Sequence, residues 1–287
     1  MELALPITIY WDLAPGESAF DSLQQICTDI LAVRPLMLQL YDPTPILGDG
    51  VRAVLERLRG EPLSVTLTIT PACLATFSEM AVTQLGVTEI LLVAEHPDDL
   101  KNISAQPSVG VSCPVTRENW RELPALVAGC RERGFNRLVL PMQRLYNEDR
   151  PFMLGKDEQT ELERALVEMG GTKDLKLTIH DPFLWRAFNP GVPFPQGGCQ
   201  AANTMIAISP DGGVYPCPTL PVRLGELGVA SLQDILASSR KKDFRRSLLL
   251  HPEACRECPE VAECKGGCRG RALVRHGSLD GVDESCR

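Results

Sequence analysis

The sequence lacks any long hydrophobic run and any sign of a targeting segment at its start. No apolar stretch approaches the roughly 18 to 20 residues that a membrane-spanning helix needs. Residues 1–6 carry no basic stretch ahead of their apolar side chains, which a secretory signal would require. We therefore expect a cytoplasmic protein that is not held in a membrane.

An excess of positive charge is also absent. The formal net charge is -8 and basic residues are mostly interspersed with acidic ones, so a nucleic-acid-binding surface is not expected. The one basic run, residues 240–246, is interpreted as the solvated face of a helix, with docking to an acidic partner as the alternative. No Ser/His/Asp set, phosphate-binding loop or dinucleotide fingerprint is found. These absences leave cysteine as the main chemical signal.

Over the first 180 residues, short apolar or β-branched runs alternate with longer amphipathic stretches. Strands are predicted at residues 7–11, 36–41, 63–70, 89–94, 108–112, 137–141 and 175–180. Helices are predicted at residues 18–34, 50–59, 72–85, 97–102, 118–133 and 156–168. Strands separated by helices favour parallel pairing with right-handed crossovers. The predicted fold class is therefore α/β with a partial (β/α) TIM-like barrel, although a doubly wound open sheet would give a similar alternation.

A Pro/Gly-rich stretch at residues 189–198 interrupts this alternation, because neither a helix nor a strand can run far through it. We place a domain boundary there, which divides the chain into domains at 1–188 and 189–287. In the second domain, residues 204–209 and 214–215 flank Pro210-Asp211-Gly212-Gly213, a strong hairpin signal. A short helix capped by Ser231 is expected to follow.

Seven of the eleven cysteines lie in this second domain. Their spacing is Cys199-x12-Gly212-x4-Cys217, then Cys255-x2-Cys258-x5-Cys264-x3-Cys268, and finally Cys286. In a reducing cytoplasm such cysteines are better suited to metal binding than to disulfides. Thiolate is a soft ligand that selects zinc, copper(I) or iron-sulfur clusters. Four thiolates hold one 4Fe-4S cluster, so seven cysteines leave one of two such sites a thiolate short.

This spacing resembles the SPASM domain, the auxiliary-cluster module found behind radical SAM barrels. The flanking residues agree, since both the hairpin at 208–218 and the segment Cys264-Lys265-Gly266-Gly267-Cys268-Arg269 are similar to that family. The resemblance covers about residues 199–287 and implies two clusters with interleaved ligands. Cys199, Cys217 and Cys268 would form a first ligand set. Cys255, Cys258, Cys264 and Cys286 would form a second ligand set.

The resemblance does not identify the fourth ligand of the first cluster, because the chain has no cysteine between Cys130 and Cys199. An oxygen or nitrogen ligand could complete the site, one iron could stay open, or the site could be degraded or hold a smaller cluster. An open iron could bind substrate, whereas a closed one could only pass electrons.

Residues 1–185 are similar to a radical SAM barrel but lack its chemistry. That family carries CxxxCxxC after the first strand, and the corresponding residues 11–22 contain no cysteine. Where the family has Gly-Gly-Glu-Pro after the second strand, residues 42–47 read Asp-Pro-Thr-Pro-Ile-Leu. The resemblance thus implies a chain that neither binds nor cleaves S-adenosylmethionine.

The remaining four cysteines lie in the barrel. Cys27 and Cys130 fall inside predicted helices and are expected to be buried apolar residues. Cys73 and Cys113 follow strands and are expected to be loop thiols, although they could share a displaced metal site with His180 or Asp181.

The leading hypothesis is a non-catalytic radical SAM-like protein with a working SPASM domain, similar to the SPASM partner proteins of GeoRSP-type peptide-maturation systems. The resemblance implies that it pairs with a true radical SAM/SPASM enzyme, holds a ribosomally made peptide or its leader, and passes electrons through two 4Fe-4S clusters. Two alternatives are an enzyme acting at an open iron of the first cluster and a zinc-bound interaction module without a redox role.

Overall fold

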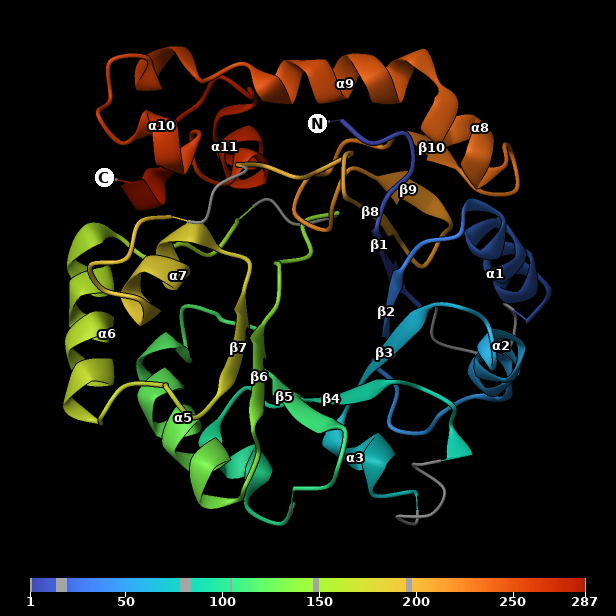
Figure 1. Ribbon diagram of the computed structural model, residues 1–287, viewed down its shortest axis with the longest axis horizontal. Helices are drawn as coiled ribbons and strands as arrows, with labels where there is room; N and C mark the ends of the chain where they lie inside the picture. Colours follow the sequence, from blue (N-terminus) through green and yellow to red (C-terminus); the bar gives the residue numbers. More distant parts are fainter. Residues whose placement is uncertain are drawn as a thin grey trace. The chain divides into compact units, whose positions relative to one another are not determined.

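The computed structural model of the chain describes residues 2–13, 20–77, 84–103, 105–146, 150–194 and 198–286 (Figure 1). It divides the chain into two compact units that interleave in sequence. The first unit consists of Met1–Val93, Gln200–Pro218 and Val222–Arg246. The second unit consists of Ala94–Cys199, Thr219–Pro221 and Ser247–Arg287. Each unit is described by itself below.

A mostly parallel sheet runs through the first unit in the order β10-β9-β8-β1-β2-β3-β4. Its strands are β1 (Thr8–Asp12), β2 (Met37–Tyr41), β3 (Ser64–Ile69), β4 (Glu89–Val93), β8 (Met205–Ile208), β9 (Gly213–Tyr215) and β10 (Gly225–Glu226). The pairs from β1 to β4 are parallel, and β8 joins β1 in parallel. β8 and β9 form the predicted antiparallel hairpin, so that expectation is confirmed.

The helices α1 (Phe20–Val33), α2 (Asp49–Leu58), α3 (Pro71–Leu74) and α8 (Leu232–Ala237) belong to the first unit. The helix α9 (Ser239–Leu249) begins in the first unit and ends in the second. In α2 the buried residues Val51, Val54, Leu55 and Leu58 recur at helical spacing. α1 packs beside both α2 and α8 (Figure 1). Ser231 caps α8, as expected, by accepting a hydrogen bond from the Asp234 backbone amide.

The basic run in α9 differs from its expected role as a solvated face. Lys241 and Arg245 are both buried, with 6% of each side chain exposed. Arg245 donates two hydrogen bonds to the Glu2 carboxylate at 2.7 and 2.9 Å, and this contact lowers the pKa of Glu2. Lys241 reaches the Leu3 carbonyl at 3.4 Å. Part of the run therefore fixes the N-terminal segment instead of facing water.

The second unit contains a parallel sheet of β5 (Val109–Ser112), β6 (Arg137–Leu140) and β7 (Lys176–Ile179) in that order. Its longer helices are α5 (Leu123–Glu132), α6 (Lys156–Glu168) and α7 (Pro182–Phe188), preceded by the 3-10 turns η2 (Pro97–Leu100) and η3 (Trp120–Glu122). α6 packs between α5 and α7. The elements η4 (Glu253–Cys255), α10 (Val261–Cys264), α11 (Arg269–His276) and η5 (Glu284–Cys286) complete this unit.

All seven strands predicted for the first 180 residues are present within a residue or two of their expected bounds. The alternation of parallel strands and helices confirms the predicted α/β fold class. The helix expected at 72–85 is wrong in part, because α3 ends at Leu74 and a turn follows, while residues 78–83 lie outside the described part of the chain. α7 was not predicted from the sequence.

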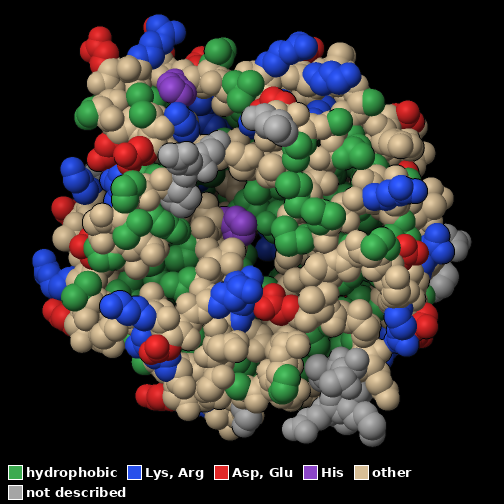
Figure 2. All heavy atoms as spheres, in the orientation of Figure 1, with side chains coloured by type: hydrophobic (Ala, Val, Ile, Leu, Met, Phe, Trp, Pro, Cys, Tyr) green, Lys and Arg blue, Asp and Glu red, His purple; other side chains and the backbone are tan. Residues whose placement is uncertain are grey.

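Charged side chains of both signs are interspersed on the face shown in Figure 2. Over the described residues, no helix combines the length and the apolar character needed to cross a bilayer.

Candidate metal centre

The second ligand set lies on a series of one-turn elements in the second unit. Cys255 ends η4, and the backbone amide of Cys258 donates to the Cys255 carbonyl at 3.1 Å. The turn continues because the Val261 amide donates to the Cys258 carbonyl at 3.1 Å, which starts α10 and carries the chain to Cys264. Such tight turns bring cysteines at short spacing onto one side of the chain.

Cys286 joins this group from the far end of the unit. Its backbone amide donates to the Asp283 carbonyl at 2.9 Å within the turn that contains η5. The buried Gln159 side chain of α6 holds this turn by donating to the Ser285 carbonyl at 2.6 Å. α6 therefore fixes a position more than a hundred residues away in sequence.

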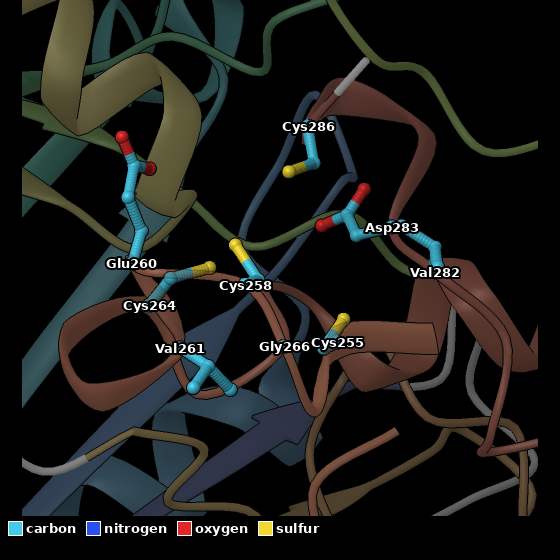
Figure 3. Close-up of a pocket in the computed structure, with 9 residues that line it drawn as sticks. All are labelled: Cys255, Cys258, Glu260, Val261, Cys264, Gly266, Val282, Asp283 and Cys286. Atoms are coloured by element: carbon cyan, nitrogen blue, oxygen red, sulfur yellow. The ribbon is translucent and has the colours of Figure 1, made fainter. Parts of the chain in front are cut away.

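All four sulfurs of the second ligand set face one hollow (Figure 3). The residues that line it are Cys255, Cys258, Glu260, Val261, Cys264, Gly266, Val282, Asp283 and Cys286. The hollow is partly open to solvent. Nowhere in the described part of the chain do three His, Cys, Asp or Glu side chains stand close enough to hold one metal ion.

The charge of this site also fits a metal group. Burial raises the pKa of Cys255, Cys264 and Cys286, and the neighbouring thiol of Cys258 raises that of Cys255 and Cys286 further. Four thiolates in one hollow repel one another, so they need a positive centre between them. A metal group would supply that charge, and the soft sulfur donors would favour iron-sulfur, zinc or copper(I).

Gly266 and Gly267 have backbone conformations that require glycine. Their φ angles are 92° and 69°, a region that favours glycine. Gly266 lines the hollow. Gly267 instead packs against protein, since a Cβ there would lie 2.8 Å from the Cβ of Asp283.

Asp283 is a site residue that the sequence analysis missed. Its side chain is 1% exposed and lies at the wall of the hollow (Figure 3). The carboxylate accepts a hydrogen bond from the Cys268 amide at 2.7 Å and from the Ser285 amide at 3.3 Å. Asp283 therefore links the backbone of a residue in the first ligand set to the turn that carries Cys286.

Arg271 of α11 neutralises Asp283. It donates to both carboxylate oxygens, at 3.1 and 2.7 Å, and is itself 2% exposed. A third bond from Arg271 goes to Asp181, whose other oxygen caps α7 by accepting from the Phe183 and Leu184 amides. Asp181, weighed as a metal ligand from the sequence, thus acts as a helix cap and as a partner of a buried arginine.

The first ligand set is divided between the compact units. Cys199 and Cys268 belong to the second unit, whereas Cys217 belongs to the first, where it is 6% exposed. Gly198 has a φ of 63°, and a Cβ on it would lie 2.6 Å from Cγ of Lys265. The chain next to Cys199 is therefore packed tightly on the chain next to Cys264.

Comparison with known proteins matches residues 199–259 to the SPASM domain, an iron-sulfur cluster-binding domain. Over 67 residues the chain is 30% identical to the cysteine-type anaerobic sulfatase-maturating enzyme of Clostridium perfringens, a match covering 22% of this chain and 18% of that enzyme. The match thus spans less than a fifth of the curated relative.

Solved structures extend the likeness to the whole fold. SuiB of Streptococcus suis aligns with a TM-score of 0.66 and 14% identity, covering 100% of this chain and 78% of that one. The enzyme anSMEcpe with bound AdoMet aligns with a TM-score of 0.63 and 14% identity, covering 97% of this chain and 94% of that one. The chain has the fold of these structures, and its residues 199–259 match the SPASM domain.

Residues 1–188 differ in sequence from the radical SAM pattern at two loops. Residues 14–19 of the cysteine-free loop lie outside the described part of the chain. In the loop after β2, Asp42 accepts hydrogen bonds from the Thr44 amide at 2.9 Å and the Thr44 hydroxyl at 2.6 Å. Asp42 thereby closes a tight turn where the superfamily has Gly-Gly-Glu-Pro.

All four cysteines of residues 1–188 are buried, namely Cys27, Cys73, Cys113 and Cys130. This confirms the expectation for Cys27 and Cys130, and it places Cys73 and Cys113 in the interior instead of on open loops. Burial raises the pKa of Cys113 and of Cys130 to about 12 in each case, and for Cys113 the nearby Cys130 adds to the effect.

We expect Cys113 and Cys130 to resist alkylation by iodoacetamide at about pH 8.5 in the native protein, because only thiolates react and these thiols stay protonated. The same two thiols in the unfolded protein are the control. Peptide mass spectrometry before and after unfolding measures the modification. Alkylation of Cys113 in the native protein as fast as in the unfolded protein would contradict the assignment.

Proposed function

We propose that the chain is an iron-sulfur protein that does not cleave S-adenosylmethionine and that partners a radical SAM enzyme in peptide maturation. It would do so in the cytoplasm, with domains at residues 1–188 and 189–287. The observation that carries the proposal is the hollow lined by Cys255, Cys258, Cys264 and Cys286. Its four soft donors match one 4Fe-4S cluster.

The proposed ligand sets follow the SPASM pattern. Cys255, Cys258, Cys264 and Cys286 hold one cluster, while Cys199, Cys217 and Cys268 hold another with a fourth ligand that is not cysteine or is missing. When bound, such clusters supply one-electron transfer. The cysteines supply the thiolates. Asp283, which Arg271 holds in place, orders the backbone around them.

The proposed partnership rests on the absence of cysteine from residues 11–22, where radical SAM enzymes hold their cluster. Without cysteine in residues 11–22, the chain has no thiolates to hold the cluster that cleaves S-adenosylmethionine. The radical must then come from another protein. The proposed peptide substrate is supported by SuiB, which has been solved with the precursor peptide SuiA and aligns with a TM-score of 0.67 and 15% identity, covering 100% of this chain and 77% of that one.

Anaerobic reconstitution of the full chain with iron and sulfide tests the proposal. We expect about eight irons per chain, four for each cluster, and an absorption band at the violet end of the visible range that bleaches on reduction. Colourless protein that binds zinc would support an interaction module instead. Cleavage of S-adenosylmethionine by the isolated chain would contradict the proposed division of labour.

Replacing Cys258 with alanine should remove about half of the bound iron, because one of two proposed clusters loses a ligand. Cys130→Ala is the matched control, because Cys130 is buried in α5 and lies outside the residues matched to the SPASM domain. This variant should have an unchanged iron content. Iron and sulfide quantitation measures both variants. Equal iron content in the Cys258→Ala variant and the unmodified chain would show that Cys258 is not a cluster ligand.

A further inference from the structure

Two buried arginines lie two residues apart on α11, directly after Cys268. Arg269 is 1% exposed and Arg271 is 2% exposed. A buried guanidinium is costly unless it is paired with a negative charge and its donors are satisfied. The two arginines meet this requirement in different ways.

Arg271 is paired within the protein. It contacts Asp283 at 2.7 Å and also forms an ion pair with Asp181. Its positive charge is thus compensated by two carboxylates, both of which lie in the same compact unit.

Arg269 has no such pair. Its two terminal nitrogens donate to backbone carbonyls, those of Leu250 at 2.9 Å and of Leu279. Its Nε is buried and has no hydrogen-bond partner. Among the residues that the structure describes, no carboxylate forms an ion pair with Arg269. The interior therefore holds a positive charge that only neutral carbonyls contact.

The place of Arg269 shows what can balance this charge. Its Nη1 would lie 3.6 Å from a Cβ on Gly266, and Gly266 lines the hollow of the second ligand set. An iron-sulfur cluster held by four thiolates in that hollow would carry a net negative charge.

We propose that Arg269 is a positioning residue for the cluster of the second ligand set, whose negative charge its guanidinium compensates. This inference rests on the proposed function, since it requires a cluster in this ligand set. A positive charge beside a cluster stabilises its reduced form, which carries one more negative charge than the oxidised form. Arg269 therefore raises the reduction potential of this cluster.

Reduction potentials of the anaerobically reconstituted full chain test the proposal. The unmodified chain is compared with Arg269→Gln, which removes the charge, and Arg269→Lys, which keeps it but cannot make the same hydrogen bonds. Arg275→Gln is the matched control, because Arg275 is exposed on the same helix and pairs with Glu284 at 3.2 Å. A redox titration followed by visible absorption and electron paramagnetic resonance gives the potentials, and iron quantitation accompanies each variant.

We expect Arg269→Gln to shift the potential of this cluster to a more negative value, Arg269→Lys to lie closer to the unmodified chain, and Arg275→Gln to leave it unchanged. If Arg269→Gln does not load iron, loading of Arg269→Lys at a near-native potential supports the charge role. Failure of Arg269→Lys to load, equal shifts in both Arg269 variants, or no shift in Arg269→Gln would each overturn it. Absence of iron from the unmodified chain would instead overturn the proposed function.

Discussion

Replacing Asp283 with alanine should lower the free energy of unfolding by about 3 kcal/mol or more and reduce iron loading. The change leaves Nε and Nη2 of the buried Arg271 without their partner, and it removes the acceptor for the Cys268 amide. Arg271 keeps its ion pair with Asp181, but two of its buried donors and the Cys268 amide lose their acceptor, and each buried donor left unsatisfied costs about 1 to 3 kcal/mol. The urea midpoint of the anaerobic protein and its iron content measure the two effects.

Glu284→Ala provides the control for this prediction. Glu284 is the next residue along the chain, and it pairs with Arg275 at 3.2 Å with both side chains partly exposed. Surface ion pairs contribute at most about 1 kcal/mol, so the midpoint should hardly change. A similar loss in the Asp283→Ala and Glu284→Ala variants would show that the buried network does not stabilise this region.

The strands and the hairpin could be predicted because their signals are local. Runs of β-branched and apolar residues mark β1 to β7, and Pro210-Asp211-Gly212-Gly213 marks the turn between β8 and β9. The proximity of Cys255, Cys258 and Cys264 could be predicted for the same reason, since they lie within ten residues of one another. Short spacing limits how far apart their sulfurs can be.

The network around Arg271 could not be predicted in this way. It joins Asp181 and Asp283, which lie 90 and 12 residues from Arg271 in sequence. Nothing local distinguishes these carboxylates from the exposed ones, because burial and pairing arise only when α7, α11 and the C-terminal turn pack together. The prediction of a solvated face for the basic run in α9 was wrong for the same reason, because Arg245 pairs with Glu2, which is distant in sequence.

A local signal for α7 is present in the sequence. Asp181 followed by Pro182 is a typical helix start, with an acidic cap and proline at the first helical position. The cap occupies one oxygen of Asp181, and the other oxygen meets Arg271. The start of this helix can therefore be predicted from the sequence, whereas the pairing with Arg271 cannot.

Gly270→Ala should destabilise the protein by about 3 kcal/mol, near the upper end for overpacking, and lower its iron content. A Cβ on Gly270 would lie 2.1 Å from the backbone carbonyl oxygen of Thr219 and 2.7 Å from its carbonyl carbon. Backbone atoms cannot rotate away as a side chain can, so α11 must shift. Because α11 begins directly after Cys268 and carries Arg269 and Arg271, that shift moves a ligand and both buried arginines together.

Gly129→Ala is the matched control, since Gly129 is also a buried helical glycine. A Cβ there would meet only the end of the Arg133 side chain, at 3.4 Å. Alanine favours a helix over glycine by up to about 1 kcal/mol, so this variant should be as stable as the unmodified chain or slightly more stable. Urea unfolding and iron quantitation compare the two variants. Full iron content and native stability in Gly270→Ala would mean that the contact between α11 and Thr219 does not hold the metal centre in place.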